Sequence, residues 1–197
     1  QDIIYLPNAV AIEDFAQFIT YDWLELEMIM REKRQIIGYY GAIAEWFDFE
    51  LVEYIANKNP EYIVLLVGEV YEGVADRVKH LNYYENIRFL KRVDYKFIPQ
   101  LLNSFNVAIL PFVINNITLS TSPVKVFEYL AGGKSVVSSD LPEVVDIDCI
   151  LIGHNKYEFN EQIKEAILLQ EDEEFIRQMQ KVAEENTWEN RVKKILN

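Results

Sequence analysis

The fold is decided by residues 122–138, which read SPVKVFEYLAGGKSVVS. The first part has helical spacing, because positions three and four residues apart share one face of a helix. The apolar residues on that face are Val124, Phe127, Leu130 and Ala131. Serine as N-cap and proline as the first helical residue are typical of a helix start, so we expect a helix over Ser122–Gly132. The apolar run after the two glycines predicts a strand at Ser135–Ser138.

Short apolar runs and helical stretches alternate on both sides of this segment. The other expected strands are Gln35–Tyr39, Tyr62–Val67, Asn86–Leu90, Asn106–Leu110 and Cys149–Ile152. The other expected helices are about Phe47–Lys58, Val74–Leu81, Lys96–Ser104, Leu141–Val145, Lys156–Gln170, Asp172–Asn186 and Thr187–Leu196. Strands that are apolar throughout are typical of a parallel sheet that is buried on both faces. The sequence therefore predicts an α/β fold with a doubly wound, six-stranded parallel sheet, Rossmann-like, with 3-2-1-4-5-6 as the working strand order.

The first 34 residues do not follow this alternation. The stretch Tyr21–Arg34 is acidic and helical in composition, and it also carries large apolar side chains such as Trp23 and Met28. Two interpretations remain open. This stretch is either a helix packed on the domain or a strap to a neighbouring one.

Composition and charge exclude several classes of protein. The chain has 19 Lys and Arg against 32 Asp and Glu, a formal net charge of −13. This balance disfavours nucleic acid and anionic membranes as partners, because both require clustered positive charge. The longest apolar runs have the length of strands, and no signal peptide is visible. The single cysteine, Cys149, is expected to be an inert core thiol. Together with the lack of a visible signal peptide, this indicates a reducing, cytoplasmic setting.

A ligand of a doubly wound sheet binds beyond the carboxyl ends of the strands, where the strand order reverses. The loops at that point are Tyr40–Trp46 and Pro111–Thr121. Gly41 in the first loop allows a tight turn and a close approach of a ligand to the backbone. The loop lacks the three-glycine dinucleotide motif, which argues against a nicotinamide or flavin enzyme.

The second loop leads to a helix whose first turn carries Lys125. A cation there opposes the helix dipole at a cost of roughly 0.3–1 kcal/mol, so a bound anion such as phosphate explains it better than capping alone. Glu128 lies one turn later on the same face. It either pairs with Lys125 or accepts hydrogen bonds from the two hydroxyls of a ribose. With the second interpretation, the helix predicts a nucleotide site.

These residues resemble the donor-binding, carboxy-terminal domain of GT-B-fold glycosyltransferases of group 1 (family 4-like). Residues 122–134 are close to the family motif SPLKVFEYLAAGKPVV. Residues 6–10 resemble the PNGVD crossing from the amino-terminal domain, although Ala9 replaces the usual glycine. Residues 86–111 resemble the family stretch NV.F.GRV…P…D…LP, and residues 187–191 match the closing TW..R helix.

The resemblance implies roles for individual residues. Glu128 would bind the ribose, backbone near Arg92 and Val93 would meet the base, and Gly41 would lie against the phosphates. The diphosphate would be held by Ser120, Thr121, Ser122, Pro123, Val124 and Lys125. Two departures weaken this assignment: Ser120 stands where many members carry a glutamate, and residues 42–45 lack the usual basic pair. Charge compensation would then rest on Lys125, with Arg92 as either a helper or a solvated surface charge.

The resemblance also implies an organisation for the chain. Residues 1–34 would be the interdomain crossing and an acidic helical region, residues 35–186 the nucleotide-sugar-binding domain, and residues 187–197 the closing helix. The chain would be half of a hexosyltransferase that builds a polysaccharide or lipid-linked glycan. It would bind the nucleotide sugar, whereas acceptor and catalytic groups would belong to the missing amino-terminal domain, so that this half alone transfers nothing. No metal or other cofactor is expected, and a peripheral membrane contact through the missing half is left open.

Two other functions share a nucleotide site of this kind. One is a GT-B-fold sugar-nucleotide epimerase, which needs carboxylates and histidines for proton abstraction; His80 and His154 are badly placed for that. The other is a non-catalytic nucleotide-binding module with a decayed site. Asp140, after the fifth strand, either reaches the cleft or only begins a turn into the helix expected at Leu141–Val145.

Overall fold

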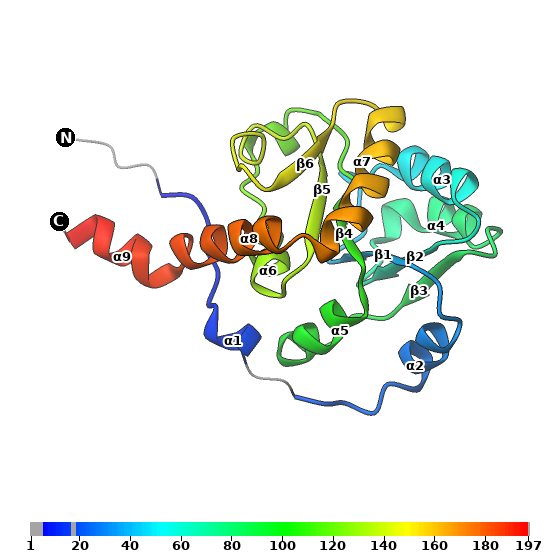
Figure 1. Ribbon diagram of the computed structural model, residues 1–197. Coiled ribbons are helices and arrows are strands. Elements are labelled where there is room, and N and C mark those ends of the chain that lie inside the picture. Colours follow the sequence, from blue (N-terminus) through cyan, green and yellow to red (C-terminus); the bar gives the residue numbers. More distant parts are fainter. Residues whose placement is uncertain (1–5, 17–18, 197) are drawn as a thin grey trace.

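The computed structural model describes residues 6–16 and 19–196, and a six-stranded parallel sheet forms its centre (Figure 1). The strands are β1 (Ile36–Tyr40), β2 (Ile63–Val67), β3 (Ile87–Leu90), β4 (Val107–Leu110), β5 (Ser135–Ser139) and β6 (Ile150–Gly153). Their order is β3-β2-β1-β4-β5-β6. This confirms the predicted doubly wound sheet and its strand order. The order reverses between β1 and β4, so their carboxyl ends mark the expected ligand side.

The apolar strands are buried because helices cover both faces of the sheet. Every residue of β1, β2, β4 and β5 is buried, whereas the outermost strands β3 and β6 are partly exposed. The α-helices are α1 (Glu13–Ala16), α2 (Leu24–Arg31), α3 (Phe49–Lys58), α4 (Ala75–Leu81), α5 (Ile98–Ser104), α6 (Lys125–Ala131), α7 (Lys156–Leu168), α8 (Glu173–Glu185) and α9 (Trp188–Leu196). Short 3₁₀ turns are η1 (Glu72–Val74), η2 (Tyr95–Phe97), η3 (Thr118–Ser120) and η4 (Leu169–Glu171). Helix α3 packs with α4 and α7, and α6 packs with α8 (Figure 1).

The acidic stretch before β1 contains a helix packed on the domain, which is the first of the two interpretations that the sequence left open. Trp23 and two residues of α2, Leu26 and Ile29, are buried in the main core. The segment before α2 is also anchored, since the Tyr21 ring stacks on Phe97 with 4.8 Å between centroids. The opposite face of α2, which carries Met28, stays in solvent.

One expected helix begins later than predicted, and another is absent. The helix expected from Ser122 begins at Lys125, and its N-cap is Val124, with no side-chain capping bond. Ser122 has a different role, because its carbonyl accepts a 2.6 Å hydrogen bond from the side chain of Asn8. Residues 141–145 form turns instead of a helix. The backbone N–H groups of Val144 and Val145 both donate to the Leu141 carbonyl, so the segment closes a single turn and does not continue as a helix.

The closing helices follow the prediction closely. Helix α8 buries Met179 and Ala183 against the domain, and α9 ends the described chain. A bridge between Val10 and Thr187 brings the two ends of the described chain together. Within the described ranges, no helix is long and apolar enough to span a bilayer.

Candidate functional site

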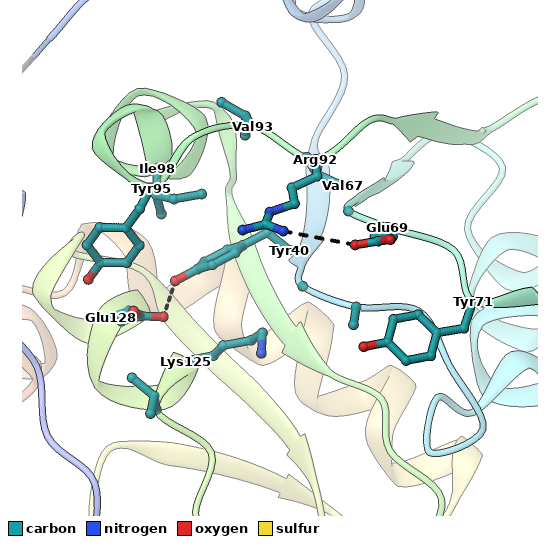
Figure 2. A pocket seen from close by; sticks show the side chains of 14 residues that line it. Tyr40, Val67, Glu69, Tyr71, Arg92, Val93, Tyr95, Ile98, Lys125 and Glu128 are labelled. Carbon is teal, nitrogen blue, oxygen red and sulfur yellow. Dashed lines mark hydrogen bonds and ion pairs between the residues drawn. The ribbon is translucent and has the colours of Figure 1, made fainter.

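A cavity of about 400 Å³ opens at the carboxyl edge of the sheet, beside the ends of β1 and β2 and the start of α6. It lies where the strand order reverses, which is the position expected for a ligand of this fold. Its lining residues are Tyr40, Gly41, Ala42, Val67, Gly68, Glu69, Tyr71, Arg92, Val93, Tyr95, Ile98, Val124, Lys125 and Glu128 (Figure 2).

The Glu128 carboxylate is a buried polar group of this cavity. Only 7 % of the residue is exposed, and its Oε2 atom accepts a hydrogen bond from the hydroxyl of Tyr40. Tyr95 directs its hydroxyl toward the same carboxylate from the other side (Figure 2). Burial, and after it the negative charge of Glu128, raises the pKa of both phenols, so each stays protonated and can donate to the carboxylate. Glu128 is therefore held as a hydrogen-bond acceptor.

Lys125 lies against the backbone of Gly41. A Cβ atom on Gly41 would be 2.2 Å from Cε of Lys125 and 2.9 Å from its Nζ, so only glycine permits this approach. The φ angle of Gly41 is 140°, which also favours glycine. Burial lowers the pKa of the Lys125 ammonium, while the neighbouring Glu128 acts in the opposite direction. A partly desolvated cation beside a bare stretch of backbone is suited to an anionic ligand.

Arg92 stands at the mouth of the cavity, after β3. Its guanidinium is 4.0 Å from the carboxylate of Glu69, and both side chains are exposed (Figure 2). Val93, the next residue, is half-buried and lines the wall. The lining thus contains two cations, Lys125 and Arg92, and two carboxylates, so the charged side chains sum to about zero.

Six of the predicted donor-binding residues line this cavity, and four do not. The six are Gly41, Arg92, Val93, Val124, Lys125 and Glu128. The hydroxyls of Ser120 and Thr121 instead bond back to carbonyls of their own loop, at 3.4 Å from Asn116 and 2.9 Å from Ile117. Ser122 is bonded to Asn8, and Pro123 is buried. The loop before α6 therefore closes on itself beside the cavity.

The aromatic part of the lining was not predicted from the sequence. The sequence predicts that Tyr40 begins the loop after the first strand, whereas in the structure it is the last residue of β1. Tyr71 and Tyr95 lie on connections whose length and composition carry no motif. The one indication in the sequence is the position of Tyr40, since a residue at the carboxyl end of β1 lies beside the point where the strand order reverses.

Other candidate residues lie elsewhere. Neither His80 nor His154 lines this cavity; His154 instead pairs with Asp140, at 2.8 Å, beyond the ends of β5 and β6. Cys149 is buried, and burial raises the pKa of its thiol to about 12, as an inert core thiol requires. In the part of the chain that the structure describes, no cluster of three or more His, Cys, Asp or Glu side chains could hold a metal ion.

Sequence comparison places the chain in a family. Residues 34–185 match the family described as Glycosyl transferases group 1. A curated relative is TuaH of Bacillus subtilis (strain 168), named for a putative glycosyltransferase role in teichuronic acid biosynthesis. It is 27 % identical over 107 residues, which are 54 % of this chain and 27 % of that protein.

Solved structures share the fold at low identity. HepE of Anabaena, in complex with UDP and glucose, superposes with a TM-score of 0.67 at 16 % identity, over 94 % of this chain and 52 % of that one. A UDP-forming α,α-trehalose-phosphate synthase from Burkholderia vietnamiensis gives a TM-score of 0.72 at 10 % identity, over 97 % and 51 %. The chain spans about a quarter of the curated relative and about half of each structural neighbour. It therefore belongs to the group 1 glycosyltransferases and has the fold of the carboxy-terminal half of a GT-B enzyme.

Proposed function

We propose that this chain is the donor-binding half of a two-domain hexosyltransferase and that its ligand is a nucleoside-diphosphate sugar. The observation that carries the proposal is the meeting of Lys125, Gly41 and Glu128 at one cavity on the switch-point edge of the sheet. An ammonium group and a carboxylate one helical turn apart match the two polar parts of a nucleotide, its phosphates and its ribose.

Each part of the ligand has a place in this proposal. The ribose hydroxyls donate to Glu128, and the diphosphate lies between the ammonium of Lys125 and the backbone of Gly41. The base lies along the wall formed by Arg92 and Val93. Support comes from the fold, because HepE of Anabaena, which shares it, has been solved with UDP-glucose. Ser120, Thr121, Ser122 and Pro123 are assigned no contact. The hydroxyls of Ser120 and Thr121 bond within their own loop, Ser122 is bonded to Asn8, and Pro123 is buried.

The chemistry of transfer follows from charge. When the bond to the sugar breaks, negative charge grows on the leaving nucleoside diphosphate, and a fixed cation beside it stabilises the transition state. Lys125 supplies that cation, and we expect donor binding to need no metal. The name of the relative TuaH supports a polysaccharide as the product. The acceptor and the groups that act on it belong to the other half in this proposal, so this chain alone binds donor without transferring it, in a cytoplasmic setting.

The test is calorimetric titration of this chain with UDP, GDP, ADP and TDP, each in EDTA. We expect one nucleotide to bind measurably, and Glu128→Gln to weaken it by at least about tenfold, because hydrogen bonds to a charged acceptor contribute roughly 1.5–3 kcal/mol each. Glu165→Gln, an exposed position on α7, is the matched control and should bind as the unmodified chain does. Failure of all four nucleotides to bind would reject the proposal, as would a Glu128→Gln variant with unchanged affinity.

A further inference from the structure

The Glu128 carboxylate is supported from behind by a side chain that cannot easily move. Tyr40 is 7 % exposed, and its ring packs edge-to-face on Tyr129 with 5.2 Å between centroids. The backbone N–H of Tyr40 donates to the Tyr129 hydroxyl at 3.2 Å, while its own hydroxyl donates to Oε2 of Glu128. Strand β1 and helix α6 are thus joined by two hydrogen bonds, and a tyrosine hydroxyl takes part in each.

The hydrogen bond from Tyr40 restricts what the carboxylate can offer a ligand. It uses Oε2, so the orientation of the carboxylate is set by a hydroxyl on a fixed strand. A carboxylate that accepts hydrogen bonds from two adjacent ribose hydroxyls must be oriented so that its oxygens face both of them. A free glutamate would have to lose side-chain entropy to do so, and Tyr40 removes that cost in advance.

Tyr95 faces the same carboxylate, but its side chain is far more exposed than that of Tyr40. It lies on the short turn η2 and is 47 % exposed, and its ring contacts Phe15 of α1 edge-to-face at 6.2 Å. A half-exposed side chain on such a turn can turn aside when a ligand arrives, whereas Tyr40 is buried at the end of a strand. The two phenols therefore differ in how exposed their side chains are, and we expect only the more exposed one, Tyr95, to be displaced by a ligand.

We propose that Tyr40 is the positioning residue of the ribose site, holding Glu128 ready for the sugar hydroxyls, and that the Tyr95 hydroxyl occupies the ribose position until a nucleotide displaces it. This inference rests on the proposed function, because it assumes that Glu128 receives a ribose. It assigns opposite consequences to the loss of two chemically identical hydroxyl groups.

The experiment compares Tyr40→Phe with Tyr95→Phe, two substitutions that each remove one oxygen and keep the ring. The probes are the nucleoside diphosphate that the chain binds and its 2′,3′-dideoxy analogue. We expect Tyr40→Phe to weaken the ribonucleotide by about tenfold, the effect of losing a hydrogen bond to a charged group. We expect the dideoxy analogue, which has no hydroxyls for Glu128 to receive, to bind Tyr40→Phe and the unmodified chain alike. Tyr95→Phe should bind the ribonucleotide up to severalfold more tightly, because no hydroxyl has to leave the ribose position, and an unchanged or weaker affinity would contradict the role given to Tyr95.

The ratio of the two affinities is measured within each variant, so a general loss of stability does not mimic the result. If Tyr40→Phe does not fold, Tyr40→Met, which also lacks the hydroxyl, takes its place. Equal ribose discrimination by Tyr40→Phe and the unmodified chain would overturn the inference, and so would a weakening by Tyr95→Phe as large as that by Tyr40→Phe. If Glu128→Gln loses binding while Tyr40→Phe keeps it, the inference alone fails; if the unmodified chain binds no nucleotide, the proposed function fails with it.

Discussion

Gly41 is the residue where backbone and ligand chemistry meet most closely, and it yields a prediction at the residue scale. Gly41→Ala should destabilise the fold by about 1–3 kcal/mol, because a side chain is strained at a φ of 140°. Its Cβ would also push against Lys125, whose Cε it would approach to 2.2 Å, and so displace the ammonium group from the cavity. We therefore expect affinity for the nucleoside diphosphate to fall more than affinity for the nucleoside. Calorimetry with both ligands, together with chemical denaturation, measures the two effects.

Gly133 provides the matched control, because it has a positive φ of 69° but no atom within 4 Å of the position that an added Cβ would take. Gly133→Ala should cost roughly 1 kcal/mol of stability through backbone strain alone. Its nucleotide affinity should be unchanged. If the two alanine variants bind the diphosphate equally well, the close approach of Lys125 to Gly41 has no part in binding.

Residue-level prediction from sequence succeeds where spacing carries the information. Helical periodicity predicts that Lys125 and Glu128 share a face, and the structure places both at one cavity. The binding roles assigned to them stay predictions. Tyr40 and Tyr95 could not be found in this way, because one ends β1 and the other lies on η2, and only the folded sheet brings both to Glu128.

At the scale of elements, the start of α6 depends on a segment more than a hundred residues away. The Asn8 side chain donates to the Ser122 carbonyl at 2.6 Å, and the Asn8 backbone N–H donates to the Ser122 hydroxyl at 3.3 Å. Arg191 of α9 in turn donates to the Pro7 carbonyl at 3.2 Å. A serine before a proline predicts an N-cap from local sequence, but here tertiary hydrogen bonds occupy the serine and the helix starts later. Local propensity alone could not predict this.

The ends of β5 and β6 are linked by an ion pair that predicts a pH dependence. Asp140 accepts from the His154 ring at 2.8 Å, and this hydrogen bond, followed by the charge of Asp140, raises the pKa of His154 above its ordinary value of 6.5. Glu158, which accepts from the His154 backbone N–H, adds a smaller effect in the same direction. A raised folded-state pKa means that the stabilisation is complete below pH 6.5 and is lost as pH rises through the shifted value.

NMR titration of the His154 ring protons measures this directly. In Asp140→Asn the pKa of His154 should fall back toward its ordinary value of 6.5. The free energy of unfolding of this variant should then no longer decrease as the pH rises above that value. Glu158→Gln, which removes the weaker neighbour, should lower the pKa less. A His154 pKa that is equal in Asp140→Asn and in the unmodified chain would show that the pair does not form in solution.

At the scale of the whole molecule, the sheet was the most predictable feature. Six apolar runs separated by helical stretches admit few arrangements other than a doubly wound sheet, because parallel strands require crossovers that pack on both faces. The segment at residues 141–145 shows the limit of this argument. Leu141 and Val144 have helical spacing and are both buried, yet the connection is a series of turns. Apolar spacing specifies which side chains enter the core, and over so few residues it does not specify the backbone between them.

The acidity of the whole chain predicts how salt affects ligand binding. The net charge of −13 repels an anionic nucleotide at long range, and the charged side chains of the cavity, two cations against two carboxylates, offer no net attraction to offset it. Salt shortens the range of this repulsion, since the Debye length falls from about 30 Å at 0.01 M to about 10 Å at 0.1 M. We therefore expect affinity for the nucleoside diphosphate to stay constant or rise over this range of NaCl concentration.

Calorimetric titration across that range provides the measurement, and the uncharged nucleoside serves as its control, because its affinity should not respond to salt. A phosphate site dominated by local positive charge behaves in the opposite way, losing affinity as salt screens the attraction. A steep fall in diphosphate affinity would therefore mean that Lys125 and Arg92 act together on the phosphates, with Arg92 released from Glu69. A flat or rising affinity would leave Lys125 as the principal cation of the site, with Arg92 held at its mouth by Glu69.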